Sequence, residues 1–225
     1  MSEIVVLQFG EAANAVGSHF WSLQMEEMKW RKQHEAVAQL SDACFLNESC
    51  SGSYSPHVVI CDNKEGFGII NPQTGACSVK RVDLKENKPT LPMHSYSGGY
   101  DSTKVQCIQQ QSDPESVLVN HWSYPYRYGY SPRSIVEVPG THSRLNPITK
   151  LTSCISQFSS QSTMELLQER IRYQLEQCDA ISGVVVLEDH SRGWCGAAVV
   201  ADYLREEGVG ALFTVGMEDR GSGVS

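Results

Sequence analysis

The sequence predicts an α/β fold in which a mostly parallel β-sheet is covered by helices on both faces. Short apolar runs rich in β-branched residues alternate with longer amphipathic stretches along the chain. The runs are mostly apolar, as expected for strands that are buried on both faces. Strands that alternate with helices imply crossover connections, which join parallel neighbours. The chain has 225 residues, of which 40% are hydrophobic, so it is long enough to bury one sizeable core.

The first two elements are a strand and a helix. Ile4–Phe9 is a nearly continuous apolar run that ends at Gly10, and it predicts a buried strand. The residues that follow predict a helix that extends to about residue 30. The apolar positions of this helix recur at helical spacing and are Ala12, Val16, Phe20 and Leu23.

The middle of the chain predicts shorter elements separated by polar segments. In order, they are a strand at His57–Cys61, a short strand at Phe67–Ile70, a helix from Asp113 to about Trp122 and a strand at Ser134–Val138. The polar segment 77–111 has no clear period, and we expect it to form an irregular insertion on the surface.

The last third of the chain shows the clearest alternation of helix and strand. In order, it predicts a helix that opens with a Ser162/Glu165 capping box, a strand at Gly183–Leu187, a helix at Ala197–Glu207 with Gly208 at its C-cap, and a strand at Ala211–Val215. We expect residues 1–217 to form one domain and residues 218–225 to form a flexible tail. Because the sequence stops just after a strand, we expect the sheet to be incomplete at the C-terminus.

Charge and cysteine content exclude several classes of protein. The formal net charge is −8, which argues against a protein that binds nucleic acid through clustered positive charge. The start of the sequence lacks the pattern of a signal peptide, so the 8 cysteines are expected to be reduced thiols. No CxxC pair predicts a structural zinc site, and no apolar run predicts a transmembrane segment.

Two strand-to-helix turns are candidates for chemistry, since parallel sheets bind ligands beyond the carboxyl ends of their strands. The first is Gly10–Glu11–Ala12–Ala13–Asn14, whose small residues allow a phosphate to approach the amides of a helix N-terminus. Two features favour the alternative, in which the small residues serve packing alone. Glu11 places a negative charge beside any bound anion, and such corners are common in sheets without ligands.

The second candidate turn is Asp189–Gly196, in which Gly193–Trp194–Cys195–Gly196 leads into a helix. One interpretation is a phosphate site at the helix N-terminus. A second is a cysteine nucleophile, because a helix N-terminus and a neighbouring His190 lower the pKa of a thiol such as Cys195. The third is a structural thiol beside a packed Trp194. Asp62, at the end of a strand, is a weaker candidate as a metal ligand or as a turn cap.

Three blocks of the sequence resemble tubulins, in the same order along the chain. "EIVVLQFGEAANAVGSHFW" is similar to the tubulin opening, in which a strand runs through G-Q-C-G-N into a helix with Phe-Trp. "SPHVVICDNKE" resembles the tubulin strand that ends in an acidic turn, and "ERIRYQLEQCDAISGVVVLEDHSRGWCGAAVVADYLREE" resembles the segment with the glycine-rich loop. The middle of the chain and "SPRSIVEV" are closer to the Misato family, the tubulin-like proteins linked to mitochondrial distribution and morphology.

This resemblance implies a Rossmann-like, doubly wound nucleotide-binding domain of the tubulin type. It places Gly10–Asn14 on the first phosphate turn, Asp62 near the metal and Gly193–Gly196 on the main phosphate loop. The sequence also departs from tubulin at these positions. Where tubulin has G-G-G-T-G-S-G, this chain has bulky and charged residues among two glycines, and Glu11 replaces a glutamine. We therefore expect no hydrolysis and no required cofactor, with weak binding of GTP and Mg²⁺ as the alternative.

Three functional hypotheses follow. The first is a non-catalytic, tubulin-like protein of mitochondrial distribution, inheritance and morphology. On this hypothesis it contacts mitochondrial-surface or cytoskeletal proteins, and it lies in the cytoplasm and peripherally on the outer mitochondrial surface. The second is a GTP-binding protein or GTPase of the tubulin superfamily. The third is a cysteine hydrolase built on Cys195.

Overall fold

The computed structural model describes residues 2–33, 43–48, 54–77, 121–123 and 129–218. The strands are β1 (Ser2–Phe9), β2 (Ala43–Cys44), β3 (Leu46–Glu48), β4 (Tyr54–Pro56), β5 (Val58–Asn63), β6 (Ile135–Val138), β7 (Ile181–Asp189) and β8 (Leu212–Met217). The α-helices are α1 (Glu11–Gln33), α3 (Leu151–Phe158), α4 (Gln161–Glu176) and α5 (Gly196–Glu206). Two short 3₁₀ helices, η3 (Pro132–Ser134) and η4 (His190–Arg192), precede β6 and follow β7.

A six-stranded sheet, parallel at every pairing in the described residues, forms the centre of the molecule. Its main path has the order β6-β5-β1-β7-β8, and β2 pairs with β1 beside this path. The chain winds outward from β1 in one direction through β5 and β6, and in the other through β7 and β8. This is the doubly wound arrangement of a Rossmann-like fold, so the predicted fold class is confirmed.

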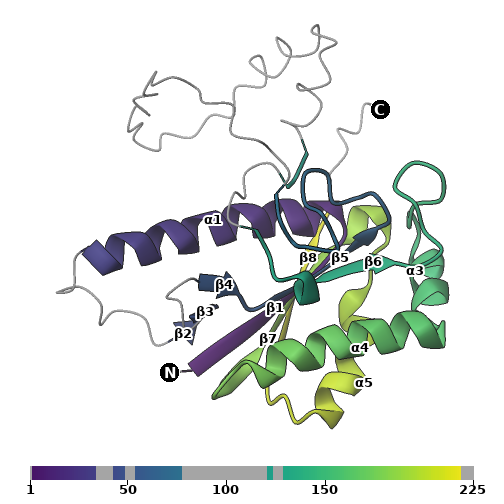
Figure 1. Cartoon of the computed structure of the whole chain (residues 1–225). Coiled ribbons are helices and arrows are strands. Elements are labelled where there is room, and N and C mark those ends of the chain that lie inside the picture. Colours follow the sequence, from purple (N-terminus) through teal and green to yellow (C-terminus); the bar gives the residue numbers. More distant parts are fainter. Residues whose placement is uncertain (1, 34–42, 49–53, 78–120, 124–128, 219–225) are drawn as a thin grey trace, which may run out of the picture.

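Helices cover both faces of the sheet, with α1 on one face and α4 and α5 on the other (Figure 1). Alternate residues of β1 point to these two layers. Val5, Leu7 and Phe9 enter a cluster with α3, α4 and α5, whereas Val6 packs in a second cluster with Trp21 of α1. The two layers explain why the strands are apolar without alternation.

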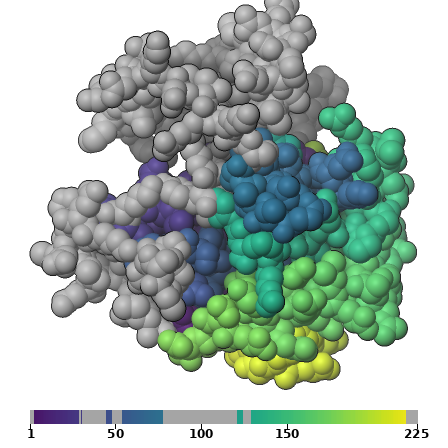
Figure 2. Space-filling view, viewed as in Figure 1, coloured from purple at the N-terminus to yellow at the C-terminus, as the bar shows by residue number. Residues whose placement is uncertain are grey.

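The segment 54–77 lies against residues 129–150 on one side of the molecule (Figure 2). The amide of Tyr130 donates to the carbonyl of Gly75 at 2.9 Å, and Tyr130 is buried with Phe67 and Trp122. The prediction of a strand at Phe67–Ile70 was wrong, because this segment packs as turns. Residues 64–69 form turns, and Ile70 makes only an isolated bridge to Cys77.

The sequence predicted α1 but misplaced its buried face. Val16 and Leu23, expected to face the core, are 50% and 64% exposed. The buried apolar positions are instead Ala13, Trp21 and Met25. Small residues beside Trp21 bring the helix close to the sheet, and a Cβ on Gly17 would lie 2.0 Å from the Gln8 side chain. The helix therefore packs on the sheet through its small residues and Trp21, and not through Val16 and Leu23.

The start of α4 also differs from the prediction. Ser160, rather than Ser162, is the N-cap, and its side chain makes no capping hydrogen bond. Glu165 accepts instead from Gln161 Nε2 at 2.7 Å. Leu167, Ile171 and Leu175 face the core as expected.

Other predicted elements fall partly outside the described residues. Most of the polar insertion at 77–111 and most of the helix predicted from Asp113 lie there, and residues 121–123 form a turn. The predicted tail 218–225 also lies there, apart from residue 218. Within the part of the chain that the structure describes, no helix has the length and apolar character needed to cross a membrane.

Candidate functional site

Both candidate turns lie at the carboxyl edge of the sheet, where the strand order reverses between β1 and β7. Gly10 follows β1, and η4 with the start of α5 follows β7. The amide of Ala12 donates to Asp189 Oδ2 at 3.1 Å, although the two residues are 177 positions apart. The structure thus brings the two turns into direct contact on one rim.

Trp194 fills the space above the first turn. Gly10 has a φ of +89°, and a Cβ placed on it would lie 2.4 Å from Cδ1 of Trp194. Trp194 is 1% exposed and makes an edge contact with Phe158 of α3, with ring centroids 6.5 Å apart. A glycine is needed here both for the backbone conformation and for the approach of the indole.

The carboxylate of Asp189 lies at the N-terminus of α1. One oxygen, Oδ2, accepts from Ala12, while Oδ1 accepts from the amide of Arg192 at 3.3 Å and from the hydroxyl of Ser191. Asp189 is 1% exposed. Arg192 also pairs with Glu11 across the outer side of this turn. A carboxylate of the protein therefore occupies the place where helix amides and the helix dipole favour an anion.

The N-terminus of α5 has a similar partner. The amide of Ala197 donates to Oε1 of Glu188, and the other oxygen of Glu188 lies 2.6 Å from Nε2 of His190. Glu188 is 4% exposed. Gly196 packs against Phe9, since a Cβ there would lie 2.0 Å from Cδ2 of the ring. The last residues of β7 thus provide one carboxylate for each of the two helix N-termini.

The remaining residues of the two turns support this contact. Ala13, in the first turn of α1, is fully buried, and Gly193 adopts a φ of +72° against the backbone of Lys150. Sequence reasoning placed Asp189 in the second turn without assigning it to the N-terminus of α1, and it missed the role of Glu188. Two consecutive acidic residues at a strand end, shortly before a helix, are the signal that could have revealed it.

Asn14 and Asp62 connect α1 to the end of β5. Asn14 Nδ2 donates to Asp62 Oδ2 at 2.9 Å, and the amide of Asn63 donates to Oδ1 at 2.7 Å. Asp62 is 3% exposed, and burial raises its pKa to about 7 despite these two hydrogen bonds. In the structure this carboxyl is a buried hydrogen-bond acceptor between two elements.

Cys195 is buried, with 6% exposure, in the cluster that contains Phe9 and Trp194. A hydrogen bond with the Cys154 thiol lowers the pKa of Cys195. His190, the candidate base, is hydrogen-bonded to Glu188 through Nε2. The near-complete burial of Cys195 favours a structural thiol over a nucleophile, because a substrate has little access to the sulfur.

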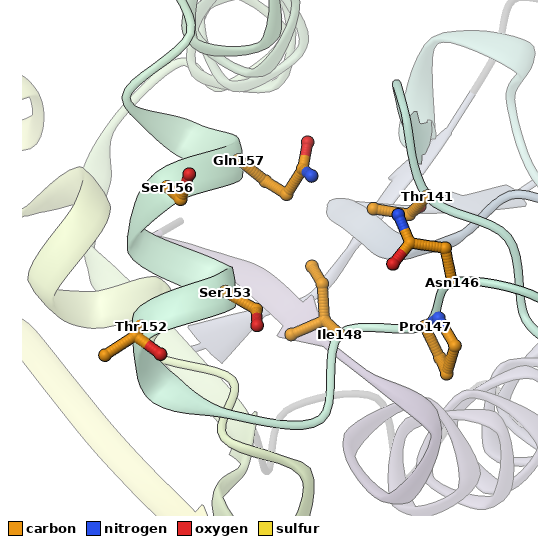
Figure 3. Close-up of a pocket in the computed structure, with 8 residues that line it drawn as sticks. All are labelled: Thr141, Asn146, Pro147, Ile148, Thr152, Ser153, Ser156 and Gln157. Carbon is orange, nitrogen blue, oxygen red and sulfur yellow. The ribbon is translucent and has the colours of Figure 1, made fainter.

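A separate shallow cavity of about 260 Å³ lies between α3 and the loop that follows β6 (Figure 3). It is lined by Thr141, Asn146, Pro147, Ile148, Thr152, Ser153, Ser156 and Gln157. This lining contains none of the residues predicted from sequence and no charged side chain. The cavity is therefore separate from the two candidate turns.

Comparison with known proteins gives the family. The sequence model of the Misato Segment II tubulin-like domain matches residues 2–120. The chain belongs to the Misato family. The part of this Misato-family chain that the model matches contains the first turn and Asp62, whereas the Asp189–Gly196 turn lies beyond it.

Individual relatives of this Misato-family chain cover nearly all of it. Protein dml1 of Aspergillus niger is 28% identical over 227 residues, which cover 92% of this chain and 45% of that protein. Misato homolog 1 of Mus musculus is 24% identical, covering 92% of this chain and 42% of that protein. Protein misato of Drosophila melanogaster is 22% identical, with coverage of 95% and 44%. The chain spans less than half the length of these curated relatives.

Proposed function

We propose that this Misato-family chain is a non-catalytic, tubulin-like protein that acts in mitochondrial distribution, inheritance and morphology through protein contacts. Membership of the Misato family supports the proposed mitochondrial role. The observation that supports a non-catalytic role is the hydrogen bond from the amide of Ala12 to the carboxylate of Asp189. In a nucleotide-binding domain of this topology, that position faces the phosphates.

We infer that the two turns do not fit a bound phosphate. A phosphate at α1 would have to displace Asp189, which is 1% exposed and also accepts from Ser191 and Arg192. It would then meet Trp194 above Gly10 and the carboxylate of Glu188 at α5. Displacement of the buried carboxylate leaves an unpaired charge, and retention places two anions together.

Magnesium also fits poorly at Asp62. Mg²⁺ requires oxygen ligands in near-octahedral geometry, and it usually retains several bound waters. The carboxyl of Asp62 is 3% exposed, and both of its oxygens accept from N–H donors. These properties disfavour a hydrated cation and support a purely structural role for Asp62.

A titration with fluorescent GTP, with and without Mg²⁺, tests the non-catalytic role. We expect no saturable binding by the purified chain at micromolar concentration, and the tubulin αβ dimer serves as the positive control. Micromolar affinity corresponds to about 8 kcal/mol of binding free energy, and the charge of Asp189 and the indole of Trp194 both oppose binding. Saturable binding or GTP turnover above buffer would contradict the proposal and favour the GTPase alternative.

The variant Asp189→Asn tests whether the charge of Asp189 is the reason that we expect no GTP binding. It removes the negative charge and keeps one oxygen for the amide of Ala12. We expect pyrophosphate and GTP to bind more tightly to this variant than to the wild type. Asp202→Asn, which removes an exposed carboxylate on α5, should leave binding unchanged. Equal affinities for both variants would contradict the role assigned to Asp189.

The mitochondrial role requires a test in cells. We expect depletion of the full-length protein to alter the shape and distribution of the mitochondrial network, and re-expression to restore them. We also propose a location in the cytoplasm and on the outer mitochondrial surface. Alkaline carbonate should then release the protein from isolated mitochondria, as expected for peripheral attachment. A normal network after depletion, or resistance to extraction, would contradict these two points separately.

A further inference from the structure

A second cluster of functional side chains lies at the opposite edge of the sheet, where the parallel strands begin. Glu3 is near the start of β1, His57 directly precedes β5, and Cys178 lies between α4 and β7. Each residue offers one ligand atom, and these atoms lie within 4.8 Å of one another. The cluster is remote from the carboxyl-edge turns and is not part of the proposed function.

His57 lies between the other two side chains. Its Nδ1 is 3.7 Å from Cys178 Sγ, and its Nε2 is 3.6 Å from Oε1 of Glu3. The imidazole is fully buried, and its Nε2 has no hydrogen-bond partner within the described part of the chain. Each ring nitrogen of this buried imidazole therefore faces a side chain that can bind a metal.

Neighbouring groups hold the ligands in place. The amide of Ala180 donates to Oε2 of Glu3 at 3.0 Å, which leaves Oε1 directed toward the imidazole. The amide of His57 donates to the carbonyl of Phe45 at 2.9 Å, and its own carbonyl accepts from the amide of Val6. Such supporting contacts orient ligands at metal sites.

We propose that Glu3, His57 and Cys178 bind one Zn²⁺ ion, with water as the fourth ligand. A carboxylate, an imidazole and a thiolate are the donor types that zinc binds. Zn–S and Zn–N bonds of about 2.3 and 2.0 Å in a tetrahedron separate sulfur from nitrogen by about 3.5 Å, close to the 3.7 Å between Cys178 Sγ and His57 Nδ1. His57 binds through Nδ1, and Oε1 of Glu3 reaches the ion by a rotation of the carboxylate that keeps the Ala180 hydrogen bond on Oε2.

Binding of Zn²⁺ releases one proton from the cluster. The Nδ1 lone pair of His57 is available to the metal when the ring is neutral with its proton on Nε2. The thiol of Cys178 releases one proton to solvent when its sulfur binds the metal. The side chain of Glu3 is 14% exposed, which gives the ion and its water a path from solvent.

A cobalt titration tests this site, since Co²⁺ binds the same donors and absorbs visible light. The purified, metal-free chain is titrated with Co²⁺ and then with Zn²⁺. We expect one equivalent of Co²⁺ to bind, with tetrahedral d–d bands and a sulfur-to-cobalt charge-transfer band, and Zn²⁺ to bleach both. Absence of a saturable one-to-one signal would overturn the proposal.

Variants assign the ligands. Cys178→Ser should abolish the charge-transfer band, whereas Cys77→Ser, at another partly buried cysteine, should retain it. His57→Gln and Glu3→Gln should each weaken binding at least about 10-fold, and circular dichroism verifies that each variant folds. Should Cys178→Ser fail to fold, Glu3→Gln decides the question, because Glu3 is partly exposed. A charge-transfer band that survives Cys178→Ser, or affinity that is unchanged in Glu3→Gln, would overturn the assignment.

Discussion

Asp62 carries a carboxyl group into a nearly closed environment between α1 and β5. Its oxygens accept from Asn14 Nδ2 and from the amide of Asn63, but both donors are neutral. Oδ1 of Asn14 is also buried and has no hydrogen-bond partner among the described residues. Desolvation outweighs the two hydrogen bonds, and it raises the pKa of Asp62 from 3.8 to about 7.

This raised pKa makes stability depend on pH. Between about pH 4 and pH 7, the folded state holds a proton on Asp62 that the unfolded state has lost. The free energy of unfolding therefore falls as pH rises through this window. Since a tenfold change in proton affinity corresponds to about 1.4 kcal/mol, the total loss is on the order of 4 kcal/mol.

We predict that Asp62→Asn flattens this pH dependence and raises the free energy of unfolding at pH 8 by about 1–3 kcal/mol. The introduced amide carries no charge, and it can donate to Oδ1 of Asn14 once that amide turns over. Urea unfolding from pH 4 to pH 8 measures the effect. Asp202→Asn, at an exposed carboxylate, should retain the slope of the wild type. An unchanged slope in Asp62→Asn would contradict the raised pKa.

At the scale of elements, the junctions of β1 with α1 and of β7 with α5 depend on one close contact. The backbone of Gly10 approaches the indole of Trp194, and a Cβ at this glycine would also lie 2.9 Å from the Cβ of Asp189. Gly208, after α5, has a similar φ of +79°, but a Cβ placed on it would meet no atom within 4 Å. These two glycines separate backbone strain from steric overlap.

We predict that Gly10→Ala lowers the free energy of unfolding by about 2–5 kcal/mol. The backbone contributes about 1–2 kcal/mol, because alanine disfavours a positive φ, and overlap with Trp194 contributes about 1–3 kcal/mol. Gly208→Ala should lose only the backbone contribution. Thermal and urea unfolding of both variants give the comparison, and tryptophan fluorescence reports displacement of Trp194. Equal losses in the two variants would contradict the proposed contact.

The sequence predicted the alternation of elements better than it predicted their contacts. The apolar runs that became β1, β5 and β7 are long enough to stand out, and a parallel sheet follows from the helices between them. The short helix α3 was missed because its eight residues, LTSCISQF, include Thr and Ser and lie in a Ser-rich region with several possible starts.

The contacts of the candidate site were less predictable for another reason. The sequence placed two turns on one rim, and the hydrogen bond between Ala12 and Asp189 confirms their proximity. It did not reveal that β7 would direct one acidic side chain to each helix N-terminus, since this depends on the rotation of the strand. The same limit applies to Glu3, His57 and Cys178, which approach one another only in the folded chain.

For the whole molecule, the central strands of the sheet and the last strand of its path differ in how well they are covered. β1 and β5 are buried on both faces, whereas β8 ends the path of the sheet in the described residues. On β8, Leu212 is 41% exposed and Phe213 is 65% exposed. An exposed edge strand with apolar side chains offers unpaired backbone groups to another chain. The net charge of −8 opposes this association without removing the patch.

We predict that the isolated chain self-associates through β8 and that Phe213→Lys shifts it toward monomer. Lysine on an edge strand places a charge where a second strand would pair, and the exposed position should keep the stability change within about 0.5 kcal/mol. Sedimentation velocity over a range of concentrations measures the association. Leu145→Lys is the matched control, because Leu145 is 84% exposed but lies in a loop. Association that falls equally in both variants would implicate general hydrophobicity, and association that persists in Phe213→Lys would place the contact on another surface.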